Sequence, residues 1–281
     1  MNTKEVHKIV AGIKTSLFKN SNSFSIGMLK SHFKGTGLKF KEHQVYTHGD
    51  DVRFIDWKIL AKTNTPYVKT FEEERNVEIT IILDCSRGMF MGYEGKSKVE
   101  AAIEVVSLLY LLSGMTKDFV QTVICTGTKI IRVQKKNGDA GIVAFVNCLK
   151  SEGIINDEGR INYSYISEAG SREEYEQQIV REFYRKRELV ILSDFYDFLE
   201  VESLRKLVSR KHVHAFRLLT PLDYAENFKY SIKGESFDGK KSGVVDVKLL
   251  SKDILSKNPI LRVKDLFLEK RYLEDFVKEM L

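Results

Sequence analysis

The chain has 281 residues, which is enough for one large domain or for a domain with an appendage. Its content of 43% apolar and 30% charged residues is typical of a folded globular protein and excludes a disordered chain. The net charge of +6 is spread along the chain and accompanies no nucleic-acid-binding or phosphate-binding motif, so we expect no nucleic-acid partner.

The cysteines and the apolar runs indicate the compartment. Cys85, Cys125 and Cys148 are odd in number, widely spaced and set in apolar surroundings, which predicts reduced thiols and not disulfides. The amino terminus has no signal-peptide pattern, and the longest apolar run, residues 105–112, is too short to span a bilayer. We therefore expect a cytoplasmic protein without a transmembrane segment.

The first 75 residues are expected to form an amino-terminal elaboration. Residues 4–19 have the apolar spacing of an amphipathic helix, which either packs on the body of the protein or lies on a membrane surface. Residues 20–50 predict loops with short strands. His32, His43 and His48 match no zinc-binding spacing, so we interpret them as structural residues.

The segment from residue 50 to 57 combines carboxylates, an arginine and the only tryptophan. Its residues of interest are Asp50, Asp51, Arg53, Asp56 and Trp57. One interpretation is an ion-paired lock, in which Arg53 bridges Asp50 or Asp56 and Trp57 is buried against a sheet. The other interpretation is a docking surface for a partner. The acidic run at 72–74 could be the other half of the lock or a solvated charge run.

Residues 76–221 show alternating strand and helix patterns that predict an α/β domain. Strands are expected at 77–83, 119–125, 129–133, 188–193 and 213–219, and helices near 97–116, 139–151, 172–186 and 200–211. The second and third strands are close enough to form an antiparallel hairpin. Right-handed crossovers then give a doubly wound, mostly parallel sheet of the Rossmann-like kind, with strand order 3-2-1-4-5. Residues 222–281 predict a hairpin around 238–243 and a helix from about 264.

Hydroxyl and carboxylate side chains follow two of the buried strands. Asp84 and Ser86 come after the first strand, and Ser193 and Asp194 end the fourth. These two strands are adjacent at the switch point of the predicted sheet, where ligands bind beyond the carboxyl ends. Such oxygens suit a hard cation such as Mg²⁺. The alternative is that Asp84 and Asp194 only cap the following helices.

The loop from Asp84 to Gly88, taken with Asp194, resembles the metal-ion-dependent adhesion site of von Willebrand factor A domains. In that family a D-x-S-x-S loop, a distant threonine and a second aspartate surround a divalent ion, and a carboxylate of the partner completes the coordination. The resemblance implies that Asp84, Ser86 and Asp194 are the metal ligands in this chain.

The chain departs from that pattern at two positions. Gly88 replaces the second serine of the loop, and residues 152–171 contain no threonine. The replacements that remain open are Asn162, Ser164 and Ser167. Because Mg²⁺ requires nearly octahedral oxygen coordination, we expect a degenerate site that binds Mg²⁺ or Mn²⁺ weakly.

Four motifs in order make a second resemblance more specific. They are GDDVRFIDW at 49–57, KTFEEER at 69–75, LDCSRGM at 83–89 and LSDF at 192–195. The sequence is similar in these motifs to the bacterial family of unknown function numbered fifty-eight, whose members carry a von Willebrand A-like domain. The resemblance implies a MoxR-type AAA+ ATPase as partner, because such ATPases are commonly encoded beside members of this family.

These observations favour a non-enzymatic protein-interaction module, an adaptor or co-chaperone of a MoxR-type ATPase. It would bind its partner over the carboxyl edge of the sheet with Arg87 and Tyr196, together with the site residues Asp84, Ser86 and Asp194. The alternative is a metal-dependent hydrolase in which Asp84 and Asp194 hold a catalytic ion. Cys85 has no histidine at a telling spacing, so it is not expected to be a nucleophile.

Overall fold

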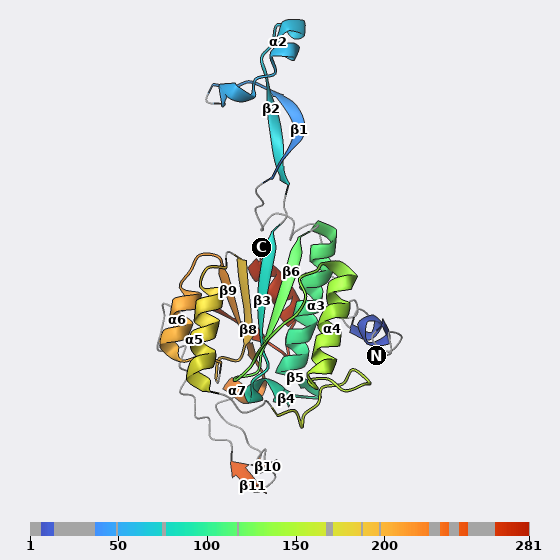
Figure 1. Cartoon of the computed structure of the whole chain (residues 1–281), viewed down its shortest axis with the longest axis vertical. Coiled ribbons are helices and arrows are strands. Elements are labelled where there is room, and N and C mark those ends of the chain that lie inside the picture. The colour runs from blue at the N-terminus through green and yellow to red at the C-terminus, as the bar shows by residue number, and fades with distance from the viewer. Residues whose placement is uncertain are drawn as a thin grey trace.

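The central element of the fold is a mostly parallel sheet flanked by helices (Figure 1). The structure, a computed structural model, describes residues 7–13, 37–48, 50–74, 77–116, 118–166, 171–186, 188–196, 198–224, 231–235, 242–246 and 262–280. Within these ranges the sheet has six strands in the order β12-β9-β8-β3-β6-β7. The strands are β3 (Glu78–Asp84), β6 (Phe119–Cys125), β7 (Ile130–Arg132), β8 (Glu188–Ser193), β9 (Val213–Leu219) and β12 (Val263–Phe267).

The strand order confirms the predicted 3-2-1-4-5 arrangement. Strand β7 pairs antiparallel with β6, as predicted from the short turn between them, and the other neighbours in the sheet are parallel. As a result the ends of β3 and β8 lie side by side, with Leu83 opposite Leu192. The mixed α/β class predicted from the sequence is thus confirmed.

The carboxy-terminal part of the chain differs from the prediction. Residues 263–267, which were expected to begin a helix, form β12 beside β9, and α8 (Tyr272–Met280) begins only afterwards. An edge strand leaves a row of backbone groups unpaired, and β12 satisfies those of β9. The guanidinium of Arg217 donates to Asp265 across this pair, with Nε 2.7 Å from Oδ1, so side chains also favour the strand.

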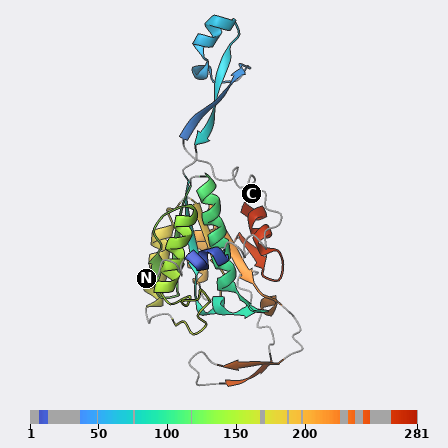
Figure 2. The same cartoon turned by 90° about the vertical axis from the view of Figure 1, so that its right-hand side faces the viewer.

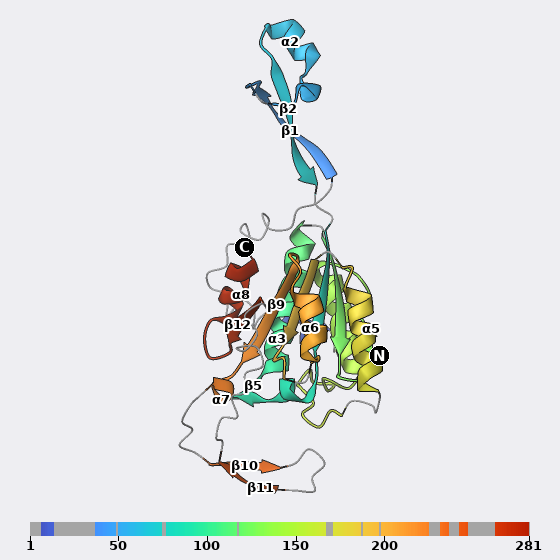
Figure 3. The same cartoon turned by 90° about the vertical axis from the view of Figure 1, so that its left-hand side faces the viewer.

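Helices cover both faces of the sheet, which explains the continuous apolar runs in its strands. The helices of one face are α3 (Lys98–Thr116), α4 (Gly138–Ser151) and α8, and those of the other are α5 (Arg172–Phe183) and α6 (Val201–Val208). Ile81 packs in the first core and Ile82 in the second, because successive side chains of a strand point to opposite faces. Figure 3 shows α8 and α5 on opposite sides of the sheet. In the described ranges no helix is both long and apolar enough to cross a membrane.

A hairpin arm extends from the amino edge of the sheet. Its strands, β1 (Gly37–Val45) and β2 (Tyr67–Glu74), are antiparallel, and they carry η2 (Val52–Phe54) and α2 (Trp57–Thr63) between them. All three views show the arm pointing away from the α/β body (Figures 1 to 3). We call residues 46–66 the arm tip. At about 3.3 Å per residue, a strand of this length holds the tip roughly 25 Å from the base of the arm.

The remaining elements lie around this body. They are η3 (Arg87–Phe90), β4 (Gly92–Tyr93), β5 (Lys96–Ser97), α7 (Pro221–Tyr224) and the hairpin of β10 (Ser231–Glu235) and β11 (Ser242–Asp246). Figure 2 shows that hairpin at the end of the molecule opposite the arm. A helix at residues 7–13 falls within the predicted range of 4–19. The rest of that range, the segment 14–36 and the turn at 236–241 lie outside the described residues, as do the side chains of residues 71–76.

Candidate functional site

Asp84, at the end of β3, is completely buried and both of its carboxylate oxygens accept hydrogen bonds. The backbone N–H of Ser86 donates to Oδ1 at 2.8 Å, and the hydroxyl of Ser193 donates to Oδ2 at 2.5 Å. Ser193 belongs to β8, so Asp84 joins the ends of the two neighbouring strands. The structure therefore brings Asp84, Ser86 and Asp194 to one edge, as the motif reading required.

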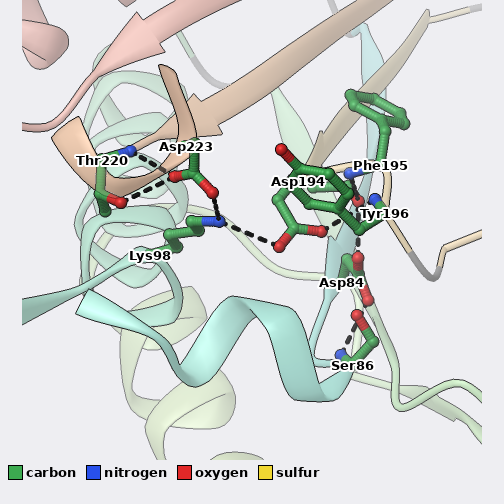
Figure 4. Close-up of polar contacts among 9 residues, drawn as sticks. Asp84, Ser86, Lys98, Asp194, Phe195, Tyr196, Thr220 and Asp223 are labelled. Atoms are coloured by element: carbon green, nitrogen blue, oxygen red, sulfur yellow. Dashed lines mark hydrogen bonds and ion pairs between the residues drawn. The ribbon is translucent and has the colours of Figure 1, made fainter. Parts of the chain in front are cut away.

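The second carboxylate, Asp194, forms a buried ion pair with Lys98. The Nζ atom of Lys98 lies 3.1 Å from Oδ2 of Asp194 and 2.8 Å from Oδ1 of Asp223. Only 1% of the Lys98 side chain is exposed. Figure 4 shows the ammonium between the two carboxylates, which approach it from different sides. We call Asp84, Asp194, Asp223 and Lys98 the edge cluster.

Asp223 is held in place by the start of α7. Its Oδ2 atom accepts hydrogen bonds from the backbone N–H and the hydroxyl of Thr220, both at 2.7 Å. This is a capping arrangement, in which the third residue of a helical turn binds the residue that begins it. The turn after β9 is thereby fixed, and Oδ1 of Asp223 is directed toward Lys98.

The turn after β8 is equally constrained. The N–H of Tyr196 donates to Oδ1 of Asp194 at 3.1 Å, and the N–H of Phe195 donates to the Ser193 hydroxyl at 2.8 Å. Phe195 has a φ of 59°, a left-handed conformation that is strained for a bulky residue. Such strain persists only where surrounding contacts enforce it. The ring of Tyr196 is half exposed, and the Lys98 ammonium lies 5.3 Å from its centroid.

Burial and neighbouring charges shift the pKa values in the edge cluster. Burial, together with the negative charge of Asp194, raises the pKa of Asp84 to about 7. Burial also raises the pKa of Asp194, although the charge of Lys98 opposes the effect. Burial disfavours the charged form of Lys98, but Asp194 and Asp223 outweigh it and raise the Lys98 pKa. The lysine therefore stays charged, and the raised pKa of Asp84 brings its titration close to neutral pH.

The donor set does not fit the divalent ion that the sequence resemblance implies. All the carboxylate oxygens of Asp84, Asp194 and Asp223 already accept hydrogen bonds within the chain. Ser86 Oγ is buried without a hydrogen-bond partner, but one hydroxyl cannot supply near-octahedral coordination. A Cβ atom at position 88 would lie 2.4 Å from Oδ2 of Asp194, so there is no room for the missing serine. In the part of the chain that the structure describes, no group of three or more acidic, histidine or cysteine residues could hold a metal.

Of the residues proposed to replace the missing threonine, Asn162 is engaged elsewhere. The side chain of Asn162 donates to the carbonyl of Gly153 at 2.9 Å and accepts from the N–H of Ser164 at 3.1 Å, so it organises its own loop. Ser167 lies outside the described residues. Cys85 is buried, and burial raises the pKa of its thiol well above the usual value, which disfavours the reactive thiolate.

The predicted lock in the arm tip is wrong. Arg53 pairs with Asp51, with Nη2 2.6 Å from Oδ2, and not with Asp50 or Asp56. Trp57 is 66% exposed instead of buried against the sheet. The physical reason is that the arm does not pack on the body, so its two strands have no second layer to cover an indole.

The carboxylates of the arm tip instead organise its local backbone. Asp50 accepts from the N–H and the hydroxyl of Thr47, at 2.8 and 2.9 Å. Asp56 caps α2 by accepting from the N–H groups of Lys58 and Ile59, and it also pairs with Lys69 and His43. Hydrogen bonds from Arg53 lower the pKa of Asp51 to about 2. The interpretation of His43 as structural fits its pairing with Asp56, whereas His32 lies outside the described residues.

Sequence reasoning missed Lys98 and Asp223. A lysine at the first position of a helix is unfavourable because the helix dipole is positive there. The lysine at this position therefore indicated that a nearby carboxylate compensates its positive charge. For Asp223 the signal was the sequence Thr220-Pro221-Leu222-Asp223 directly after a buried strand, which has the spacing of a capping box.

A separate cavity lies away from the edge cluster. It has a volume of about 770 Å³ and is lined by the helix at 7–13, by Glu100, Ile103 and Glu104 of α3, and by the loop around residues 155–161. None of the residues predicted to form the site lines it. Its position therefore does not bear on the chemistry of the edge cluster.

Comparisons with known proteins give one family and several distant relatives. The sequence profile of the family described as "Protein of unknown function DUF58" matches residues 42–226. "Uncharacterized protein Mb1516" of Mycobacterium bovis and "Uncharacterized protein Rv1480" of Mycobacterium tuberculosis are each 24% identical over 190 residues. These alignments cover 67% of this chain and 57% of each relative, so the chain spans little more than half the length of the relatives.

Two solved structures are also similar. The conserved hypothetical protein BatB from Bacteroides thetaiotaomicron matches with 16% identity and a TM-score of 0.43, over 73% of this chain and 97% of that one. An aerotolerance-related membrane protein from Bacteroides fragilis matches with 16% identity and a TM-score of 0.44, over 73% of this chain and 98% of that one.

Proposed function

This chain belongs to the DUF58 family of proteins of unknown function, and we propose that it is a non-enzymatic protein-interaction module with a von Willebrand A-like domain. It acts as an adaptor or co-chaperone of a MoxR-type AAA+ ATPase and binds it over the carboxyl edge of the sheet. The family resemblance in the four sequence motifs suggests this partner. A cytoplasmic location is part of the proposal, in keeping with the free cysteines Cys85, Cys125 and Cys148.

The observation that carries the proposal is the contrast between the edge cluster and its surroundings. In the cluster, Lys98 pairs with Asp194 and Asp223, and Asp84 is buried and hydrogen-bonded within the chain, whereas the loops around them present exposed side chains. We call these exposed side chains the edge rim: Arg87, Met91, Tyr163, Ile166 and Tyr196. The stacking of Phe90 on Tyr165, with centroids 5.6 Å apart, holds two of the rim loops together. A rigid surface with exposed aromatic and arginine side chains has the composition of a binding hot spot.

The alternative, a metal-dependent hydrolase built on Asp84 and Asp194, has less support. Its catalytic ion would compete with the Ser86 N–H and the Ser193 hydroxyl for Asp84, and with Lys98 for Asp194. A general base would also have to come from a group that is not already engaged in these contacts.

We further propose that the same ATPase contacts the arm tip. Trp57 and Arg53 are both exposed there, and these residue types dominate binding energy at protein interfaces. The capping contacts of Asp51 and Asp56 keep the tip ordered, so little conformational entropy would be lost on binding. The module would then bind its partner through both the edge rim and the arm tip.

Binding to the ATPase encoded beside this gene tests the proposal. We expect Arg87→Glu and Tyr196→Ala to weaken binding by at least about tenfold in calorimetry, because both change the edge rim. The matched controls are Lys206→Glu on α6 and Tyr184→Ala, an exposed tyrosine at the other end of the sheet, and both should bind as the wild type does. Near-ultraviolet circular dichroism checks that all four variants are folded.

Two results would contradict the proposal. If all four folded variants bind equally well, the edge rim is not the binding surface. The second result is that the wild-type protein does not bind the ATPase in co-purification, or in calorimetry at protein concentrations of about 0.1 mM. Any Kd would then be too weak for a standard interface, and the proposed partner is wrong.

A further inference from the structure

The position of Lys98 has a cost that its neighbours must offset. It is the first residue of α3, where the helix dipole disfavours a cation, and it is almost completely buried. A buried ammonium is tolerated only when it is paired and hydrogen-bonded. Lys98 thus requires carboxylates, and the turns after β8 and β9 each provide one.

The surroundings of the Lys98 ammonium are complete. An ammonium has three N–H donors. Two of its directions are occupied by Oδ2 of Asp194 at 3.1 Å and Oδ1 of Asp223 at 2.8 Å. The face of the Tyr196 ring occupies a third side, 5.3 Å from the nitrogen, within the usual range of a cation–π contact. Figure 4 shows these groups arranged around Lys98.

Gly88 allows Asp194 to adopt this arrangement. A Cβ atom at this position would lie 2.4 Å from Oδ2, the oxygen that binds the ammonium. The loop after β3 can therefore approach Asp194 this closely only because Gly88 has no Cβ atom. The glycine that removes a hydroxyl ligand from the metal-site pattern is also the residue that makes room for the ion pair.

We propose that the Lys98 ammonium takes the place of a divalent cation at the carboxyl edge, so that the edge cluster is a metal-independent version of the site. The ammonium joins the start of α3 to the turns after β8 and β9, as a metal joins its ligands. The shape of the edge rim then does not depend on divalent ions. This inference is independent of the identity of the partner.

Removing the ammonium while leaving the carboxylates should create a metal site. In Lys98→Ala, Asp194 and Asp223 face a space from which their cation has been deleted, and Asp84 lies beside them. Mn²⁺ binding to the full chain is measured by the loss of the free-ion signal in electron paramagnetic resonance. We expect Lys98→Ala to bind Mn²⁺ at least about tenfold more tightly than the wild-type protein, and Asp223→Asn in the same chain to remove the gain.

Melting temperatures provide a second readout. Ligands that bind only the folded state raise the melting temperature, so Mn²⁺ should stabilise Lys98→Ala by several degrees. The wild-type protein should shift by less than about 1 °C. Lys96→Ala is the matched control. Lys96 lies two residues before Lys98 in the sequence, and it pairs with a different carboxylate, that of Glu104. It should gain no affinity for Mn²⁺.

Two outcomes would overturn the proposal. One is Mn²⁺ binding by the wild-type chain that Asp194→Asn abolishes. The other is a folded Lys98→Ala variant that binds Mn²⁺ no better than the wild-type chain. If Lys98→Ala does not fold without metal, refolding is followed by circular dichroism with and without Mn²⁺. Recovery in Mn²⁺ supports the proposal, and no recovery overturns it.

Discussion

The edge cluster and the arm tip contain similar residues, but these residues differ in burial and in the direction of their pKa shifts. Each region has several aspartates, a cation that pairs with one or two of them, and an aromatic side chain nearby. In the edge cluster the charges are buried and the pKa of Asp84 is raised to about 7. In the arm tip the ion pair is exposed and the pKa of Asp51 is lowered to about 2.

The difference arises from what lies behind each segment. The edge cluster is at the end of a sheet that has helices on both faces, so its side chains lose water on folding. The arm has two strands and no covering layer, and apolar side chains such as Val45, Val52 and Trp57 stay exposed to solvent. Two-stranded hairpins are marginally stable by themselves, and the capping contacts of Asp50 and Asp56 offset part of that weakness. Residue types alone thus do not decide between a buried network and a docking surface.

The largest effect is expected when one buried carboxylate is removed. Asp194→Ala leaves Lys98 with one carboxylate in place of two, and breaking a buried pair costs about 3–5 kcal/mol of unfolding free energy. Asp51→Ala also removes the carboxylate of an ion pair, but at the surface, where solvent screens the pair and the cost is much smaller. Urea unfolding of both variants measures the contrast. Equal losses would mean that the edge cluster is not the buried network described here.

A smaller loss is expected for Gly88→Ala. The added methyl group would lie 2.4 Å from Oδ2 of Asp194, and overpacking of this kind costs about 1–3 kcal/mol. Gly12→Ala is the control, because a Cβ atom there meets no other atom within 4 Å, and in a helix the change should be neutral or stabilising. A neutral Gly88→Ala would show that Asp194 can move away from Lys98 without cost.

The sheet was predictable because its signals are local and repeated. Each apolar run in the strands is long enough to identify, and crossover handedness then fixed the order of the first five strands. Strand β12 was missed because its residues, with only Leu266 fully buried, also fit the start of a helix. Lys98 was overlooked and the burial of Trp57 in the lock was wrong for a common reason. Lysines are usually exposed and tryptophans are usually well buried, and only the tertiary structure reverses both tendencies here.

The pH dependence of stability should have opposite signs in the two regions. Asp84 keeps its proton up to about pH 7 in the folded chain but only to about pH 4 in the unfolded chain. The folded state binds more protons between these values, so the contribution of Asp84 to stability is lost as the pH rises from about 4 to about 7. Asp51 has a lowered pKa, so its contribution is present above about pH 4 and is lost as the pH falls toward about 2.

The variant Asp84→Asn isolates the effect in the edge cluster. Its unfolding free energy relative to the wild type should increase as the pH rises from about 4 to about 7 and then stay constant. Denaturation in urea at several pH values gives this difference directly. A difference that is independent of pH would show that the pKa of Asp84 is not raised. Asp51→Asn, the matched variant of the arm, should show no such trend above about pH 4.

The smallest effect on stability is expected for Trp57→Ala. Since the side chain is 66% exposed and the arm does not pack on the body, its loss should change the unfolding free energy by about 0.5 kcal/mol or less. Partner binding should respond differently, because an exposed tryptophan that becomes buried in an interface is the type of residue whose truncation costs about 2 kcal/mol or more. Urea unfolding and calorimetry with the ATPase measure the two quantities on the same samples, with Tyr184→Ala as an exposed aromatic control on the body. A destabilisation near 3 kcal/mol would restore the interpretation of Trp57 as part of a buried lock. Unchanged binding would remove the arm tip from the interface. A loss of binding with intact stability would identify Trp57 as a contact residue.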